Sequence, residues 1–372
     1  MNYHLILTLV LSKSLNMKLN FTLLIGIVLL LQLLFPAKAE AQDPHFSQFY
    51  AAPTFLNPAM TGVFEGRWRA NIVYRDQWSS ILGNKPFRTL AGAFDMRYHV
   101  VGGDFVGFGL NILRDEAGES NFTVNRGQLG FSYMKQVAGS KYRSDVQYLI
   151  AGAQLGAGQH RFDWSKLWFS SQYNSGTGTP DIGSPNGEPG YTGDLQQTDI
   201  YLDFNAGLMY YALFGDNTSV YGGGALYHIN APNVSFFEAA DEELAMRWLA
   251  HAGGEVPFTR ELSLLPAVVV MGQGPSFETT FGANIRYTNH DWYEVALRAG
   301  IWLRNTRTVT GQQFESFIVT AILEVERWNL GISYDITSSS LKTANNARGA
   351  FEITLIYTQP AKSRYKVNCP KF

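Results

Sequence analysis

The sequence contains almost no cysteine: Cys369 is the one thiol among 372 residues. A single cysteine excludes a disulfide framework within one copy of the chain and leaves only an intermolecular disulfide. Small exported domains that depend on disulfides are therefore ruled out. The stability of the fold must come from hydrogen-bonded secondary structure or from a membrane.

Charged residues are also scarce, at 16% of the chain, compared with roughly 25% in ordinary soluble domains. Aromatic residues reach 14%, and glycines number 36. The formal net charge of −2 provides no basic footprint, which argues against a nucleic-acid partner. This composition indicates large surfaces that face something other than water.

Familiar catalytic motifs are missing as well. The chain has no HExxH, no GxSxG, no phosphate-binding glycine loop and no Cys/His cluster. We expect a non-enzymatic protein without metal or cofactor, although a Ser/His pair on a barrel wall needs no strong local motif. No two histidines share a short metal-ligand spacing, so each is interpreted as a polar loop or lumen residue: His4, His45, His99, His160, His228, His251 and His290.

The N-terminal part has the order of a targeting signal. From Met17 it reads MKLNFTLLIGIVLLLQLLFPAKAEAQ, with Lys18, an uncharged run over 21–35 and small residues at 37–41. The apolar run is shorter than the roughly 20 residues of a spanning helix. We predict a cleaved secretory signal over 1–41, with translation starting at Met17. Its removal takes three lysines and one glutamate and leaves a net charge of about −4.

Beyond residue 66, apolar and polar residues alternate with a period of two. YLDFNAGLMY (201–210) alternates Leu, Phe, Ala, Leu and Tyr with Asp, Asn and Gly, and WNLGISYDI (328–336) does the same over its whole length. Because successive side chains of a strand point to opposite faces, each segment has one apolar and one polar face. The pattern predicts strands and almost no helix.

The number and length of these segments favour a membrane barrel. Many have 10–13 residues, close to the roughly 9–11 of a tilted spanning strand and longer than the usual 5–6. An even number suits a bacterial barrel. A secreted sandwich also alternates and remains the alternative fold. We expect about fourteen strands: 67–78, 87–98, 104–113, 122–137, 145–159, 199–213, 218–230, 244–255, 261–271, 276–288, 292–304, 313–325, 327–337 and 348–358.

The connections between these segments alternate in length, as the short periplasmic turns and longer outer loops of such barrels do. The even-numbered connections are mostly brief, for example FGDNT, NHD and ER. The odd-numbered ones are mostly long, including residues 164–198 and SSSLKTANN. One connection, GQGP, is short where a long one is expected.

The first expected strand, RWRANIVYRDQW, places three arginines on its polar face: Arg67, Arg69 and Arg75. In a closed barrel the first and last strands are neighbours, and the last strand places Glu352 inward while the one before it supplies Asp335. We hypothesise that these five residues form a charge network that packs the lumen. The alternative is a wet lumen with unpaired charges.

Both ends of the mature chain resemble one family. DPHFSQFYAAPTFLNPAMTG (43–62) and RANIVYRDQW closely resemble the opening of the PorP/SprF family, outer-membrane proteins of the type IX secretion and gliding machinery of Bacteroidetes. GISYDITSSSLKTANNARGAFEITLIY (331–357) and the terminal NCPKF resemble the closing signature of that family. The resemblance implies an all-β fold: a transmembrane antiparallel β-barrel of about fourteen strands, long-chain fatty-acid transporter-like, with an N-terminal segment plugging the lumen.

The segment over 42–64 is the expected plug. Its three prolines disfavour regular structure because each lacks an amide donor and restrains its neighbour. Its aromatic residues can pack on the barrel wall, and its polar residues can hydrogen-bond in the lumen. The alternative is a leader that only seals the base of the barrel. The residues expected to plug the lumen or to contact a periplasmic partner are Asp43, Pro44, His45, Phe46, Ser47, Gln48, Tyr50, Asn57, Pro58 and Gly62.

The resemblance also implies a function. The barrel over 65–358, followed by a periplasmic tail over 359–372, is expected in the outer membrane after Sec-dependent export. It would be a non-enzymatic component of type IX secretion and gliding, supporting export or surface attachment of large adhesins. The implied partners are outer-membrane lipid, a periplasmic peptidoglycan-binding lipoprotein, ring proteins of the machinery and the adhesin cargo. The alternative function is a passive channel for hydrophobic solutes.

Overall fold

The computed structural model describes most of the chain beyond the predicted signal. The signal over 1–41, the tail from residue 361 and Cys369 lie outside the described residues. The described ranges are 43–83, 85–100, 102–118, 120–139, 145–163, 166–167, 172–180, 196–215, 218–236, 242–288, 295–308, 311–340 and 342–360.

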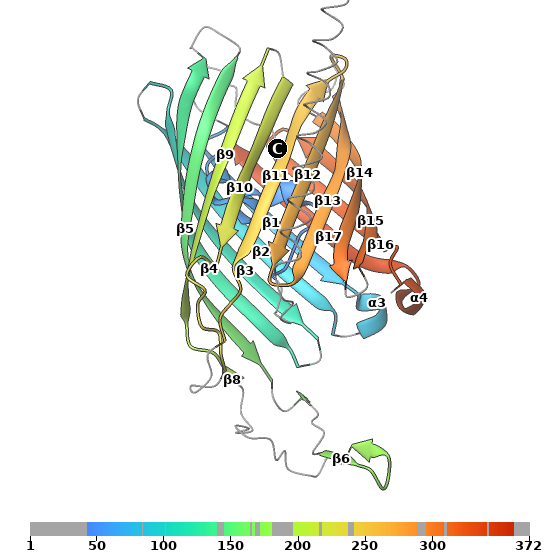
Figure 1. Cartoon of the computed structure of the whole chain (residues 1–372). Helices are drawn as coiled ribbons and strands as arrows, with labels where there is room; N and C mark the ends of the chain where they lie inside the picture. Colours follow the sequence, from blue (N-terminus) through green and yellow to red (C-terminus); the bar gives the residue numbers. More distant parts are fainter. Residues whose placement is uncertain are drawn as a thin grey trace, which may run out of the picture. The chain divides into compact units, whose positions relative to one another are not determined.

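Long antiparallel strands make up the fold (Figure 1). The described helices have at most four residues, too few to cross a membrane. The long strands are β1 Trp68–Gln77, β2 Phe87–His99, β3 Phe105–Ala117, β4 Phe122–Gly139, β5 Val146–Phe162, β9 Tyr201–Phe214, β10 Thr218–Tyr227, β11 Arg247–Pro257, β12 Leu262–Gln273, β13 Ser276–Thr288, β14 Val295–Thr308, β15 Gly311–Val325, β16 Trp328–Thr337 and β17 Arg348–Gln359.

These fourteen strands close into a barrel. Each pairs with its neighbours in the chain, β5 pairs with β9, and β1 pairs with β17 from Trp68↔Gln359 to Gln77↔Ala350. Three further strands are short: β6 Tyr173–Asn174 and β7 Thr179–Pro180 pair with each other, and β8 Gln196–Gln197 pairs with β5. Closure leaves no free edge among the long strands, which is the condition for a sheet in lipid.

The two faces of the wall follow the alternation in the sequence. On β9, Leu202 and Leu208 point outward and are 58% and 60% exposed, whereas Asp203 and Asn205 point inward and are buried. On β16, Leu330 and Ile332 are outward, and Asp335 is buried inside. The barrel therefore has an apolar outer face suited to lipid and an inner face where polar residues stand beside an apolar cluster that includes Ile150, Met209 and Val269.

The connections differ between the two ends of the barrel. We call the end where β1 begins and β17 ends the terminal end, and the opposite end the loop end. The longest connections, between β5 and β9 and between β10 and β11, lie at the loop end. Figure 1 shows the short helices α3 Ser79–Leu82 and α4 Lys342–Asn345 together at the loop end.

The sequence predicts one short connection at the loop end, GQGP, but the structure has more than one. The connection between β3 and β4, and the one between β14 and β15, are also short, because these strands run beyond their expected ends. β4 and β5 have 18 and 17 residues, more than the roughly 9–11 that a bilayer requires. β4 and β5 are therefore longer than a bilayer crossing requires.

Candidate functional site

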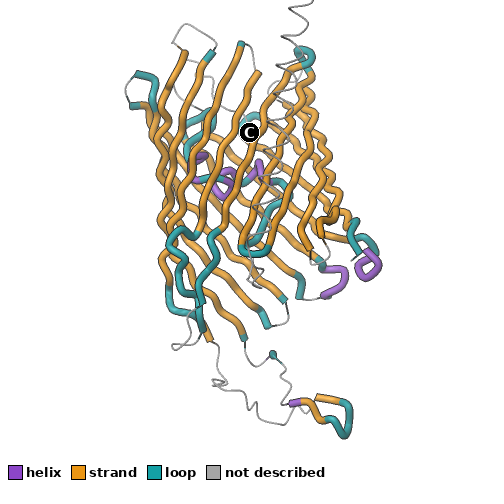
Figure 2. The backbone as a smooth tube through the Cα atoms, viewed as in Figure 1, coloured by secondary structure: helices purple, strands orange, loops and turns teal. Residues whose placement is uncertain are grey.

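The N-terminal stretch over 43–64, here called the lumen segment, lies inside the barrel (Figure 2). It folds as three single turns: η1 Phe49–Ala51, α2 Pro53–Leu56 and η2 Pro58–Met60. Pro53 and Pro58 each occupy a first helical position, where the missing amide hydrogen costs nothing. The Asn57 side chain caps η2 by accepting a hydrogen bond from the backbone N–H of Ala59. The prolines thus divide the segment into short turns.

Apolar and small residues let the segment fit closely against the wall. Phe49 and Tyr50 pack on the buried Trp302 of β14, with ring centroids 5.2 and 5.5 Å from that indole. Across the lumen, Gly152 of β5 faces η2 so closely that an added Cβ would lie 2.4 Å from the backbone of Pro58. Side chains of the segment therefore fill one side of the lumen, and wall glycines admit its backbone on the other.

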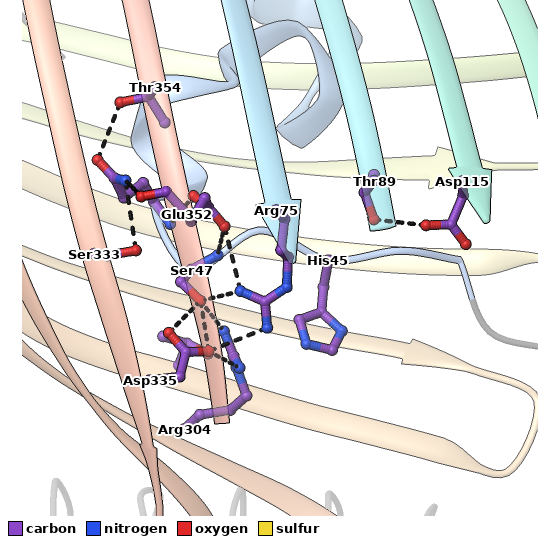
Figure 3. Close-up of polar contacts among 12 residues, drawn as sticks. His45, Ser47, Arg75, Thr89, Asp115, Arg304, Ser333, Asp335, Glu352 and Thr354 are labelled. Carbon is purple, nitrogen blue, oxygen red and sulfur yellow. Dashed lines mark hydrogen bonds and ion pairs between the residues drawn. The ribbon is translucent and has the colours of Figure 1, made fainter. Parts of the chain in front are cut away.

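Ser47 is the centre of the first polar attachment, which we call the Ser47 anchor (Figure 3). The Ser47 hydroxyl donates to Asp335 at 2.7 Å and accepts hydrogen bonds from Arg75 and Arg304. The backbone N–H groups of Ser47 and Gln48 each donate to a different oxygen of Glu352, both at 2.8 Å. A carboxylate that accepts two successive amides fixes the backbone at this point.

The wall charges of the Ser47 anchor are paired with one another. Arg75 lies 3.1 Å from Asp335 and 3.3 Å from Glu352, and Arg304 lies 2.9 Å from Asp335. All four side chains are buried. The lumen segment adds only neutral hydrogen-bonding groups, so the charges that compensate these arginines all come from the wall.

His45 lies beside this anchor, with Nδ1 3.5 Å from Glu278 on β13. Burial, together with the cations Arg304 and Arg75, lowers the pKa of His45 to about 3. The imidazole is therefore neutral near pH 7, and its contact with Glu278 is not an ion pair. Arg304, 3.4 Å from the same carboxylate, is the cation that compensates Glu278.

Asp43 forms the second attachment, which we call the Asp43 anchor, closer to the loop end. Its carboxylate contacts Arg126 of β4, His228 at 2.6 Å and Arg247 of β11 at 3.5 Å. His228 also contacts Asp203 at 2.8 Å through its other ring nitrogen. Here the wall presents two arginines and a histidine against one carboxylate of its own, and the lumen segment supplies the second carboxylate.

The ionisation of this anchor follows from those contacts. Burial opposes ionisation of Asp43, but Arg126, His228 and Arg247 together hold the pKa of Asp43 well below its ordinary value. Burial likewise opposes protonation of His228, but Asp43 and Asp203 outweigh it and raise the pKa of His228. Both shifts favour a charged carboxylate against a charged imidazole.

Polar side chains hold the middle of the segment. The Asn57 amide donates to the carbonyl oxygens of Leu208 and Gly224, both at 3.2 Å. The Thr54 hydroxyl donates to Asn111 of β3 at 2.8 Å. These partners lie on β3, β9 and β10, so the segment is attached on several sides of the barrel.

The terminal end of the segment is fixed by the Arg69–Asp95 pair of the wall. Asp95 of β2 accepts hydrogen bonds from Arg69 at 2.7 Å and from the backbone N–H of Gly62 at 2.7 Å. Gly62 has a positive φ of 74°, and a Cβ there would lie 2.7 Å from Gly107 on β3. A side chain at position 62 would therefore be strained and would also meet the wall.

Of the arginines expected in the lumen network, Arg67 requires correction. Arg69 and Arg75 are buried and paired, and Asp335 and Glu352 are the carboxylates of Arg75. Arg67 is exposed, because it precedes the first residue of β1, and no ion pair joins it to another described residue. Alternation places Arg67 on the same side of the chain as Arg69 and Arg75, but Arg67 lies before β1, where its side chain is exposed.

The remaining plug residues lie with their neighbours inside the barrel. Pro44 and His45 line a cavity of about 50 Å³, the space left between the segment and this part of the wall. The Phe46 ring packs edge-on against Phe55, with centroids 5.9 Å apart.

The sequence does not mark several wall residues as contacts of the segment, and for His228 it indicates only a polar loop or lumen position: Arg126, Asp203, His228, Arg247 and Arg304. Inward parity on their strands marks Arg126, Asp203 and Arg304 as lumen residues, but it does not indicate which of them meets the segment. No group of three or more His, Cys, Asp or Glu among the described residues has the geometry of a metal site. The arrangement holds a polypeptide in place.

Comparisons with known proteins agree with the resemblance noted in the sequence. The model of the family described as "Type IX secretion system membrane protein PorP/SprF" matches residues 38–357. No protein of curated function is significantly similar in sequence.

Among solved structures, a TodX monoaromatic hydrocarbon channel mutant is 13% identical, with 82% of this chain and 93% of that one covered and a TM-score of 0.46. A Pseudomonas aeruginosa FadL homologue is 11% identical, with 82% and 94% covered and a TM-score of 0.44. The P. putida toluene transporter TodX is 10% identical, with 82% and 93% covered and a TM-score of 0.43. Identities this low concern the barrel fold and not the function.

Proposed function

Because the chain belongs to the PorP/SprF family of type IX secretion membrane proteins, we propose that it supports export or surface attachment of large adhesin-type cargo. In this proposal it is a non-enzymatic component whose lumen is closed by its own N-terminal segment. It works with other secretion components, including a periplasmic peptidoglycan-binding lipoprotein and the ring proteins.

One observation carries the proposal: the lumen segment is attached by buried polar groups along its whole length. Asp43, Ser47 and Asn57 are all buried, and each contacts charged or polar groups of the wall. A passive solute channel needs a continuous path, and a segment held in this way obstructs one. The geometry therefore favours a protein that binds and positions polypeptides, and it disfavours a channel for hydrophobic solutes.

Quantitative mass spectrometry of the cell-surface proteome tests this function. Cells that lack the gene are compared with cells complemented by the full chain or by a chain without residues 43–62. We expect loss of one or a few large surface proteins in the deletion strain and their recovery with the full chain. Failure of the truncated chain to restore them would assign the segment a role in secretion.

An unchanged surface proteome in the deletion strain would contradict the proposed role. A matched control is the Arg67→Ala chain, because Arg67 is exposed and outside the anchors. It should restore the surface proteins fully. Outer-membrane levels of every variant are measured in parallel, so that loss of cargo is not confused with loss of the barrel.

A further inference from the structure

The outer wall of the barrel carries a groove, and among the anchor residues only Arg126 contributes to its lining. It has a volume of about 530 Å³ and crosses β1 to β5, within the roughly 300–1,000 Å³ range of small-molecule sites. Its rims include Ile72, Leu90 and Ile112, which are 53%, 50% and 59% exposed on the outer face. The groove therefore opens to the surroundings of the barrel and not to the lumen.

The groove arises from the register of the strands. Paired positions place Ile72, Gly92, Ile112, Gly127 and Ala157 in one row across five strands. Three of the five residues in this row are glycine or alanine, so space is left above them between the two isoleucines and beyond Ile112. A Cβ added to Gly127 would meet no atom within 4 Å.

Charged residues lie beside the groove, toward the loop end. Arg88 pairs with Asp76 and Arg114 pairs with Glu116, all on the outer face. Arg161 is also exposed there, and no carboxylate among the described residues pairs with it. Together the three arginines and two carboxylates leave one excess positive charge. These side chains lie one or two outward-facing positions from the apolar row, a distance of about 7–13 Å along the strands.

This layout matches one class of molecule. The groove lies on the loop-end side of the wall, which by the usual orientation of such barrels is the outer leaflet. An apolar hollow inside the bilayer with excess positive charge at the membrane surface complements a lipid with an acyl chain and an anionic headgroup. We propose that the groove binds an acyl chain of one anionic outer-leaflet lipid, whose phosphate lies against Arg114 and Arg161.

The acyl chain and the phosphate of the lipid would each interact with a different part of the site. The acyl chain fills space that the wall leaves empty, so dispersion contacts are gained above Gly92 and Gly127. The phosphate compensates Arg161 and shares Arg114 with Glu116, which is 38% exposed at the side chain and free to yield. A free phosphate would satisfy only the arginines, and an uncharged hydrocarbon would satisfy only the hollow.

Native mass spectrometry of the purified full-length protein tests the proposal, with phosphatidylglycerol as the probe lipid. Gly127→Leu fills the groove from its floor without a clash with the wall. The matched control is Gly222→Leu on the outer face of β10, where the nearest atom to an added Cβ is an ordinary 3.6 Å away. Both variants must show the heat-dependent gel migration of a folded barrel. Ala157→Leu narrows the same groove and serves as a second variant.

We expect the parent and Gly222→Leu to retain one tightly held phosphatidylglycerol, and Gly127→Leu and Ala157→Leu to retain about tenfold less, equivalent to about 1.4 kcal/mol. Equal retention in all four proteins would overturn the proposal. So would cross-linking of a cysteine at position 127 to a polypeptide in cells, because the occupant would then be a protein.

The headgroup is tested with the double variant Arg114→Gln and Arg161→Gln. The parent should prefer phosphatidylglycerol over phosphatidylcholine about two- to fivefold, the size expected of exposed ion pairs, and the double variant should lose that preference. Inorganic phosphate should not displace the lipid, since the acyl chain supplies most of the binding. Displacement by phosphate, or an unchanged preference in the double variant, would contradict this assignment.

Discussion

The Asp43 anchor and the Ser47 anchor hold the same lumen segment with opposite distributions of charge. At the Ser47 anchor, Arg75 and Arg304 are compensated by Asp335 and Glu352, all from the wall. At the Asp43 anchor, the wall cations are compensated in part by the carboxylate of the segment itself. Withdrawal of the segment therefore removes no charge from the first set and removes one carboxylate from the second.

This difference indicates which anchor resists release. A buried cation that loses its partner costs several kcal/mol, whereas a buried ion pair that loses only a neutral neighbour keeps its main interaction. The Asp43 anchor is accordingly the stronger attachment. Any process that frees the segment must supply another anion to Arg126 and Arg247 or move them into water.

Loss of the Asp43 charge should have the largest effect. Asp43→Asn leaves Arg126 and Arg247 short of one buried carboxylate, and we expect the segment to be held about 3–5 kcal/mol less tightly. The rate at which maleimide labels a cysteine placed at the buried Ala52, in a Cys369→Ser background, reports release. Each 1.4 kcal/mol corresponds to a tenfold faster rate. Asp43→Glu, which keeps the charge, should behave much more like the parent, and equal labelling of Asp43→Asn and the parent would refute the ranking.

Removal of the Ser47 hydroxyl should have a smaller effect. Ser47→Ala deletes a donor to Asp335 and an acceptor for Arg75 and Arg304, but the ion pairs among these residues remain. We expect a loss of about 1–3 kcal/mol in the same labelling assay. If Ser47→Ala released the segment more readily than Asp43→Asn, the contrast between the anchors would be reversed.

Acidification should weaken the segment through His45. The pKa of His45 is about 3 with the segment in place and near its ordinary 6.5 when the segment is exposed. The neutral form is favoured in the lumen, so the contribution of His45 is fully present above about pH 6.5 and is lost as the pH falls toward 3. At pH 5.5 the loss is about 1.4 kcal/mol, a tenfold faster labelling of the cysteine at position 52.

The His45→Gln variant is the control for this pH effect, because it retains His228 and every other titrating group. Each labelling rate is divided by that of a cysteine at the exposed Ser79, which removes the pH dependence of the thiol reaction. The parent and His45→Gln should diverge between pH 7.5 and 5.5. Parallel pH profiles would show that protonation of His45 does not act on the segment.

The smallest effect is expected at Arg67. Because Arg67 is exposed and outside the anchors, Arg67→Ala should change the attachment of the segment by less than about 0.5 kcal/mol. Arg69→Met is the paired comparison, since it leaves Asp95 buried without its cation. A large effect of Arg67→Ala would mean that the charge network extends past the first residue of β1.

The barrel could be predicted from the sequence because its signal is local. Alternation with a period of two marks both faces of a strand, and it assigned Leu202 outward and Asp203 inward. The exact strand ends could not be predicted in this way: β3 and β14 continue beyond their expected limits because alternation fades where the wall leaves the bilayer.

The anchors could be predicted only in part. Arg75, Asp335 and Glu352 come from strands that closure makes neighbours, so their proximity follows from the topology. The partners of Asp43 come from β4, from β11 and from the residue after β10, and they meet only because an irregular segment passes between them. No periodicity in the sequence encodes the path of such a segment.

Single-channel recording in planar bilayers shows whether the lumen segment closes the barrel. The purified full chain and a chain without residues 43–62 are compared under the same conditions, after both are shown to be folded. If the segment closes the barrel, the full chain is silent and the truncated chain conducts. A full chain with the steady conductance of an open pore, or a folded truncated chain that stays silent, would contradict it.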